Sequence, residues 1–113
     1  MGKTRVHSPH VYPLPGAPFM SFWNDLPYDC ELRDIVNEGL KSLKEDRCAG
    51  TQIEKDKFPK AYREFGLSNL YKLNLKKNFR LTYTLIATDE GICPHVIEVM
   101  SHPEYLRRFG YKR

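Results

Sequence analysis

The most regular hydrophobic pattern in the chain lies between residues 29 and 46. Its apolar positions recur three and four residues apart, with charged residues between them; they are Leu32, Ile35, Val36, Gly39, Leu40 and Leu43. One apolar stripe at this spacing predicts an amphipathic helix packed against a core, which ends before Gly50. Residues 19–26 show the helical spacing with aromatic side chains and stop before Pro27, so we expect a brief helix ahead of the long one.

Three strand-like runs follow at residues 70–75, 79–87 and 95–100. The first alternates apolar and polar positions, and the other two are rich in the β-branched and aromatic residues that suit a half-buried sheet. Short polar turns at residues 76–78 and 89–91 separate the runs, which predicts antiparallel hairpins. Residues 51–69 are expected to form a polar connector.

The two ends of the chain are less regular. Residues 5–12 alternate weakly and contain Pro9, so we expect an edge strand or an extended arm within residues 1–18. Residues 102–113 predict a short helix or arm, broken at Gly110. The element order is then β-α-α-β-β-β with a tail. At 113 residues this is one α+β domain, in which two N-terminal helices pack on one face of an antiparallel sheet and the basic residues occupy the other face.

Charge is distributed unevenly around a net value of +4. Residues 21–46 carry seven acidic and three basic residues, whereas residues 65–88 carry no acidic residue. The basic residues of that second segment are Lys72, Lys76, Lys77 and Arg80, and the tail adds Arg107, Arg108, Lys112 and Arg113. A basic second half predicts a surface that meets a polyanion.

Several classes of protein are disfavoured. No apolar run approaches the roughly 20 residues of a membrane helix, and the N-terminus lacks the apolar stretch of a secretory signal. The cysteines Cys30, Cys48 and Cys93 are odd in number and irregularly spaced, so a reduced, cytoplasmic protein is expected. No four-ligand zinc spacing, Gly-rich phosphate loop or nucleophile elbow is present, and we expect no metal and no cofactor.

Three stretches carry a resemblance to a known family. Residues 69–75 (NLYKLNL), 78–85 (NFRLTYTL) and 96–102 (VIEVMSH) resemble, in order and spacing, the strands of RelE/ParE toxins of type II toxin–antitoxin systems. The two predicted helices lie where that family has its helical pair, and the resemblance covers about residues 19–111. It implies a RelE/ParE-like fold and a small cognate antitoxin as partner. RelE-like members bind the ribosomal A site and cut mRNA, whereas ParE-like members act on DNA gyrase.

The resemblance carries over to some positions and not to others. The family's strand lysine matches Lys72, and the arginine of its aromatic-Arg motif matches Arg80. A second strand lysine falls at Asn74, and the arginine that follows the last strand falls near Pro103; both positions depart from the family pattern. The tail tyrosine of some members falls near Phe109, with Tyr105 and Tyr111 nearby.

Metal-independent RNA cleavage uses the 2′-hydroxyl as the nucleophile on the adjacent phosphate. A side chain must take that proton, another must protonate the leaving 5′-oxygen, and cations must stabilise the developing charge. Arg80 is the candidate for phosphate stabilisation, because a guanidinium binds phosphate through two parallel hydrogen bonds. The candidates for proton transfer or base stacking are His102, Tyr105 and Tyr111. The candidates for binding RNA are Lys72, Lys76, Lys77, Arg107 and Arg108.

Each of these residues also has a structural interpretation. Arg80 can form a structural salt bridge, the lysines can protect a solvated sheet face, and Tyr105 can pack the tail onto the core. The leading hypothesis is a toxin that acts as a ribosome-dependent mRNA endoribonuclease, with an antitoxin, mRNA and the ribosome as partners. The alternatives are a ParE-like DNA gyrase inhibitor, or a non-catalytic RNA- or antitoxin-binding module on the same fold. The nuclease hypothesis requires the basic side chains to converge around Arg80.

Overall fold

The structure is a computed structural model and describes residues 10–110. Its strands are β1 (Tyr12–Pro13), β2 (Thr51–Gln52), β3 (Tyr71–Asn74), β4 (Phe79–Thr88) and β5 (Gly91–Ser101). Its helices are α1 (Phe19–Asp25), α2 (Glu31–Glu45) and α3 (His102–Arg108), with short 3₁₀ turns η1 (Lys55–Lys57), η2 (Lys60–Phe65) and η3 (Lys76–Asn78). The predicted α+β domain, with two helices ahead of the sheet and a short helix after it, is confirmed. No helix within the described range is long and apolar enough to cross a membrane.

The five strands form one mixed sheet in the order β1-β5-β4-β3-β2. The β2, β3, β4 and β5 strands pair antiparallel, but β1 runs parallel to β5, with Tyr12 opposite His95. The prediction of a purely antiparallel sheet is therefore wrong at this edge. It failed because β1 has no hairpin partner, and nothing in its two residues indicates which strand it joins. Of the edge strand expected within residues 5–12, only the last residue falls in β1, and residues 5–9 lie outside the described range.

Two other elements differ from the prediction. The expected connector contains β2, whose two residues pair with β3 but are too few to show an alternating pattern. β5 begins at Gly91, several residues before the predicted strand, and continues through Pro94. Proline is tolerated there because β1 pairs with β5 only at His95 and Val96, so Pro94 lies at an open edge on that side.

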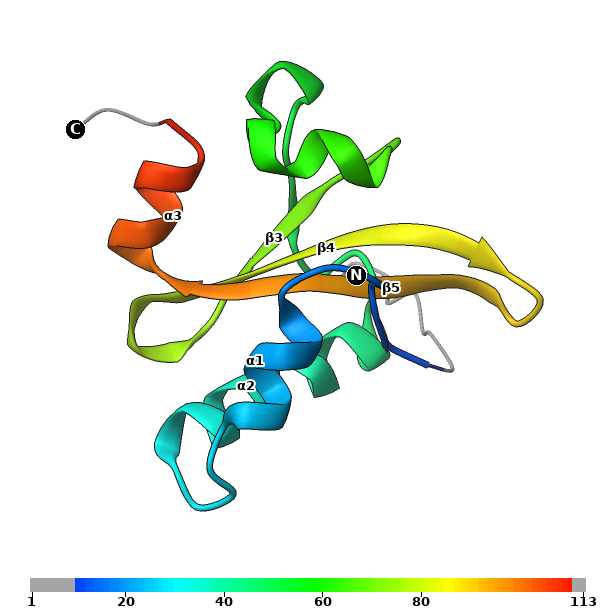
Figure 1. Ribbon diagram of the computed structural model, residues 1–113. Helices are drawn as coiled ribbons and strands as arrows, with labels where there is room; N and C mark the ends of the chain where they lie inside the picture. Colours follow the sequence, from blue (N-terminus) through cyan, green and yellow to red (C-terminus); the bar gives the residue numbers. More distant parts are fainter. Residues whose placement is uncertain (1–9, 111–113) are drawn as a thin grey trace, which may run out of the picture.

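One face of the sheet is covered by α1 and α2 (Figure 1). Val36 and Leu43 of α2 are fully buried against Leu81 and Tyr83 of β4. A side chain at Gly39 would approach Leu75 to within 2.5 Å, so the absence of a Cβ lets α2 lie close to the sheet. The apolar stripe predicted for this helix is the surface that packs, which explains why the sequence located the helix accurately.

The opposite face carries a second core rather than an open basic surface. Figure 1 shows α3 and the segment containing η2 above the sheet, on the side away from α1 and α2. Tyr62, Tyr105 and Phe109 pack there on Ile97 and Met100 of β5. The expectation that this face carries the basic residues is met by Lys72 and Arg80, which lie on it, but not by Lys76 and Lys77. The aromatic residues of the connector and the tail were treated as peripheral, whereas they bury much of this face.

Candidate nucleic-acid interface

Lys72, Arg80 and His102 come from three different elements. Lys72 lies on β3 opposite Thr82, and Arg80 lies two residues before Thr82 on β4, so the two cations share a face of the sheet. His102 is the first residue of α3. It lies beside Arg80 because Phe79 at the start of β4 pairs with Ser101 at the end of β5. We call Lys72, Arg80 and His102 the basic cluster.

The Arg80 guanidinium is held by neutral partners. Its Nη2 lies 2.9 Å from Nδ1 of His102, and its Nη1 donates to the carbonyl oxygen of Phe79 at 3.1 Å. A guanidinium has donors only, so Nδ1 of His102 accepts and the imidazole proton is on Nε2. The Nε atom of Arg80 is buried and has no hydrogen-bond partner within residues 10–110. No carboxylate in that range forms an ion pair with Arg80, so the guanidinium is not neutralised by an acidic partner.

Lys72 lies over an aromatic ring. Its Nζ is 5.4 Å from the ring centroid of Tyr105, a distance at which a cation is attracted to the ring face. Partial burial and, second, the positive charge of Arg80 lower the pKa of Lys72 below that of a free lysine. The two cations therefore repel each other, and a bound anion would relieve this repulsion.

Tyr105 supports the basic cluster from the second core. The residue is 3% exposed, and its ring stacks on Phe109 with centroids 4.4 Å apart. The side chain of Tyr105 is therefore buried, and the face of its ring lies beneath Lys72. Tyr111, the other tyrosine considered for proton transfer, lies outside the described residues.

A buried carboxylate fixes α3 to the sheet. Glu98 of β5 is 7% exposed, accepts a hydrogen bond of 2.5 Å from the hydroxyl of Tyr62, and pairs with Nη1 of Arg108 at 2.7 Å. The Tyr62 hydroxyl also lies 2.9 Å from Oγ1 of Thr82. Burial and the neighbouring Glu98 charge raise the pKa of Tyr62 well above its usual value, so the hydroxyl keeps its proton. We call Tyr62, Thr82, Glu98 and Arg108 the carboxylate network.

Sequence reasoning missed Glu98 and Tyr62. The available signal was a single acidic residue inside the apolar strand 95–100, since a buried carboxylate requires a cationic or hydrogen-bonding partner. Arg108, expected to bind RNA, is one such partner and also pairs with Glu104 at 3.2 Å. Arg107 pairs with Glu104 as well. Both arginines lie in the last turn of α3, the helix that begins at His102, and both already form ion pairs with carboxylates.

Lys76 and Lys77 do not join the basic cluster. Lys76 Nζ lies 3.1 Å from Glu38, and Lys77 Nζ lies 2.9 Å from Glu31; both carboxylates belong to α2, on the other side of the sheet. The backbone of η3 turns them there, since Lys77 adopts a left-handed conformation with φ of 59°. These ion pairs are exposed and contribute little to stability. The sequence-based picture of one patch containing all four cations is therefore wrong, and an RNA-binding role for these two lysines stays a prediction.

The basic cluster can bind an anion and place an imidazole beside it. Within residues 10–110, no three histidine, cysteine, aspartate or glutamate side chains gather to hold a metal ion. Comparison of the chain with protein-family models, with curated protein sequences and with solved structures finds no match.

Proposed function

We propose that this chain is a RelE/ParE-type toxin of a type II toxin–antitoxin system and that it cleaves mRNA in the ribosome. The observation that carries the proposal is the meeting of Lys72, Arg80 and His102, from β3, β4 and α3, without a carboxylate paired to Arg80 in the described range. The resemblance of residues 69–102 to the strands of this toxin family also supports it.

Arg80 and Lys72 bind the scissile phosphate in this proposal. The buried Nε of Arg80 lacks a partner in the described part of the chain, so a phosphate oxygen reaching it would supply the missing hydrogen bond. Lys72 adds a second positive charge against the same phosphate. Fixed cations of this kind stabilise the additional negative charge of the pentavalent transition state.

His102 transfers the proton. Its Nδ1 accepts from Arg80 in the absence of RNA, so a phosphate that takes over Nη2 of Arg80 releases the Nδ1 lone pair. The 2′-hydroxyl then gives its proton to Nδ1 as its oxygen bonds to phosphorus, and the imidazolium returns a proton to the departing 5′-oxygen. The products are a 2′,3′-cyclic phosphate and a free 5′-hydroxyl. Tyr105 contributes the ring beneath Lys72.

The test is expression of the chain in a bacterial host, followed by growth measurement and mapping of transcript ends. We expect growth arrest and mRNA cut within translated regions, with 5′-hydroxyl ends. Arg80→Ala should remove both effects while the purified variant keeps a cooperative unfolding transition. The matched control is Lys41→Ala, which removes an exposed cation of α2 outside the basic cluster and should stay toxic. An Arg80→Ala variant that remains folded and fully toxic would contradict the proposal.

One observation favours a second candidate. Four of the expected RNA-binding residues are engaged by carboxylates: Lys76, Lys77, Arg107 and Arg108. These four cations are therefore less available for a long RNA contact, which suits a protein that binds its target without cutting RNA, as a ParE-like gyrase inhibitor would. Growth arrest with intact transcripts and gyrase-dependent DNA breaks would select this candidate.

A further inference from the structure

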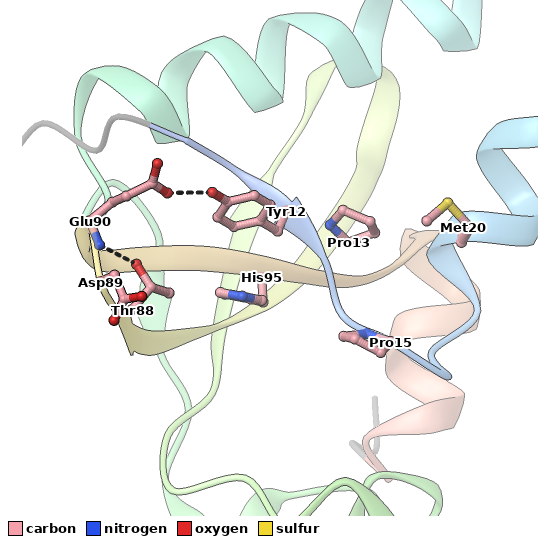
Figure 2. A pocket seen from close by; sticks show the side chains of 8 residues that line it. All are labelled: Tyr12, Pro13, Pro15, Met20, Thr88, Asp89, Glu90 and His95. Atoms are coloured by element: carbon pink, nitrogen blue, oxygen red, sulfur yellow. Dashed lines mark hydrogen bonds between the residues drawn. The ribbon is translucent and has the colours of Figure 1, made fainter.

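A hollow lies at the far end of the β4–β5 hairpin from the basic cluster. Its volume is about 700 Å³, and it lies between β1, the start of α1 and the turn that joins β4 to β5 (Figure 2). Thr88, at its rim, lies eight residues along β4 from Arg80, or roughly 26 Å of extended strand. The hollow is therefore separate from the proposed RNA site. We call it the hairpin pocket.

The wall of the hairpin pocket is largely apolar. The rings of Tyr12 and His95 lie together with centroids 5.3 Å apart, because these residues are paired in β1 and β5. Pro13 and Pro15 continue the wall with fixed backbone angles and no N–H donor. Met20 of α1 is 48% exposed and completes this side with a flexible thioether, which adapts to varied apolar partners.

The rim of the hairpin pocket is acidic and held in place. The backbone N–H of Glu90 donates to Oγ1 of Thr88 at 3.1 Å, and this hydroxyl donates to the carbonyl oxygen of Gly91 at 2.8 Å. The Glu90 carboxylate accepts a hydrogen bond of 2.5 Å from the hydroxyl of Tyr12, as Figure 2 shows, and pairs with Nε2 of His10 at 3.1 Å. That hydrogen bond, with burial as a smaller effect, raises the pKa of Tyr12 to about 12.

Asp89 carries a charge of this rim that no cation within residues 10–110 pairs with, and the residue is exposed. On α2, by contrast, Glu31 pairs with Lys77 and Glu38 pairs with Lys76. The carboxylate therefore stands beside an aromatic and apolar wall without a counterion from the described chain. A cation with an apolar stem complements both parts of this arrangement.

We propose that the hairpin pocket binds a basic, extended segment of a partner protein. An arginine or lysine of that segment lies with its stem along Tyr12 and its charged head against Asp89, and a neighbouring apolar side chain contacts Met20. Charge complementarity supports this occupant, because the pocket is an acidic site on a chain of net charge +4. Phosphate-bearing nucleic acid is disfavoured by the same carboxylates.

Two other occupants fit less well. Among the described residues of a second copy, Arg107 and Arg108 of α3 are already paired with Glu104 and Glu98, and the basic residues between positions 55 and 63 lie in the 3₁₀ turns η1 and η2 and not in an extended segment. A small polyamine would pair with Asp89 but has no apolar side chain to bury the exposed Met20. The backbone of β1 offers little pairing to an added strand, because Pro13 lacks an N–H. The side chains of the pocket, and not the backbone of β1, would therefore recognise the bound segment.

The test uses isotope-labelled protein and a synthetic hexapeptide of alternating arginine and leucine with blocked ends. We expect chemical-shift changes at Tyr12, Met20 and Asp89, and none from a matched peptide of alternating glutamate and leucine. Asp89→Asn should weaken binding about threefold, the effect of one exposed ion pair. The matched control is Asp34→Asn, which removes an exposed carboxylate of α2 and should leave the affinity unchanged.

Four results would overturn the proposal. They are shifts confined to the acidic face of α2, unchanged affinity in Asp89→Asn, equal binding of spermidine at the same residues, and self-association through the pocket at rising protein concentration. The outcome does not depend on mRNA cleavage, since Asp89→Asn leaves the basic cluster intact. Toxicity of this variant and of Arg80→Ala, measured side by side, distinguishes failure of one proposal from failure of the other.

Discussion

Arg80 and His102, 22 residues apart in the chain, are joined by a hydrogen bond of 2.9 Å between Nη2 and Nδ1. The bond determines which imidazole nitrogen carries the proton, because the guanidinium can only donate. It also occupies the lone pair that a proton acceptor would use. His102 is therefore held in one tautomer, and its Nδ1 lone pair becomes available only when a ligand replaces it as the partner of Arg80.

The tautomer of His102 is directly measurable. Nitrogen chemical shifts of the imidazole should show the proton on Nε2 in the native chain, and a mixture of tautomers in Arg80→Met, where Nδ1 has lost its donor. His95 is the internal control: its Nδ1 lies 3.0 Å from the carbonyl oxygen of Cys93, which only accepts, so its proton is on Nδ1. The two histidines should thus show opposite tautomers. A native His102 with its proton on Nδ1 would contradict the arrangement described here.

Lys72 should lose its proton at lower pH than a free lysine. Burial and the charge of Arg80 lower its pKa. Arg80→Met removes the positive charge but not the burial, so this substitution should raise the pKa of Lys72 part of the way back. Between the lowered pKa of Lys72 in the folded state and its unfolded value of 10.5, the unfolded state binds more protons than the folded state. The free energy of unfolding should therefore rise with pH in this window. Titration of the Nζ resonance checks the shift.

Anion binding provides a second check on Lys72. The affinity for inorganic phosphate should fall as pH rises through the lowered pKa of Lys72, because one of the two cations is then lost. In Lys72→Met the affinity should be weaker and should no longer change with pH in this window. An unchanged pH profile in that variant would show that Lys72 does not contact the anion.

The carboxylate network should contribute measurably to stability. Glu98→Ala leaves Tyr62 without an acceptor for its hydroxyl and Arg108 without a buried partner, and should lower the free energy of unfolding by about 2 to 3 kcal/mol. Tyr62→Phe should lower it by about 1 to 2 kcal/mol. Glu38→Ala, which breaks only an exposed ion pair, should change it by less than about 0.5 kcal/mol. Urea denaturation measures all three, and equal effects of Glu98→Ala and Glu38→Ala would refute a buried role for Glu98.

Two glycines should respond differently to alanine. At Gly50 the added Cβ would lie 2.5 Å from the backbone oxygen of Lys72 and 2.7 Å from the hydroxyl of Tyr83, which accepts from the Gly50 N–H. The backbone oxygen cannot move without displacing β2 from β3, so Gly50→Ala should destabilise the protein by about 2 to 3 kcal/mol. At Gly39 the Cβ meets only the end of the Leu75 side chain, which can rotate, and alanine favours the helix by about 1 kcal/mol. Thermal unfolding should therefore show a clearly smaller loss for Gly39→Ala.

The sequence by itself determined the elements whose pattern is local. The stripe that predicts α2 arises because each apolar residue meets the same packing surface every turn, and the helix spans Glu31–Glu45 as expected within two residues at its start. β4 was located by its run of β-branched and aromatic residues. The sequence placed the basic residues on the face away from the helices, and Lys72 and Arg80 lie there together because the register of β3 and β4 puts Lys72 opposite Thr82.

Only the tertiary structure decided which distant residues meet. The parallel pairing of β1 with β5, the contact between Arg80 and His102, and the burial of Glu98 against Tyr62 each join segments with no local pattern in common. The direction of Lys77 depends on a left-handed turn and on an acidic residue that α2 brings near. Such contacts depend on how the elements pack against one another, and a one-dimensional pattern contains no information on that packing.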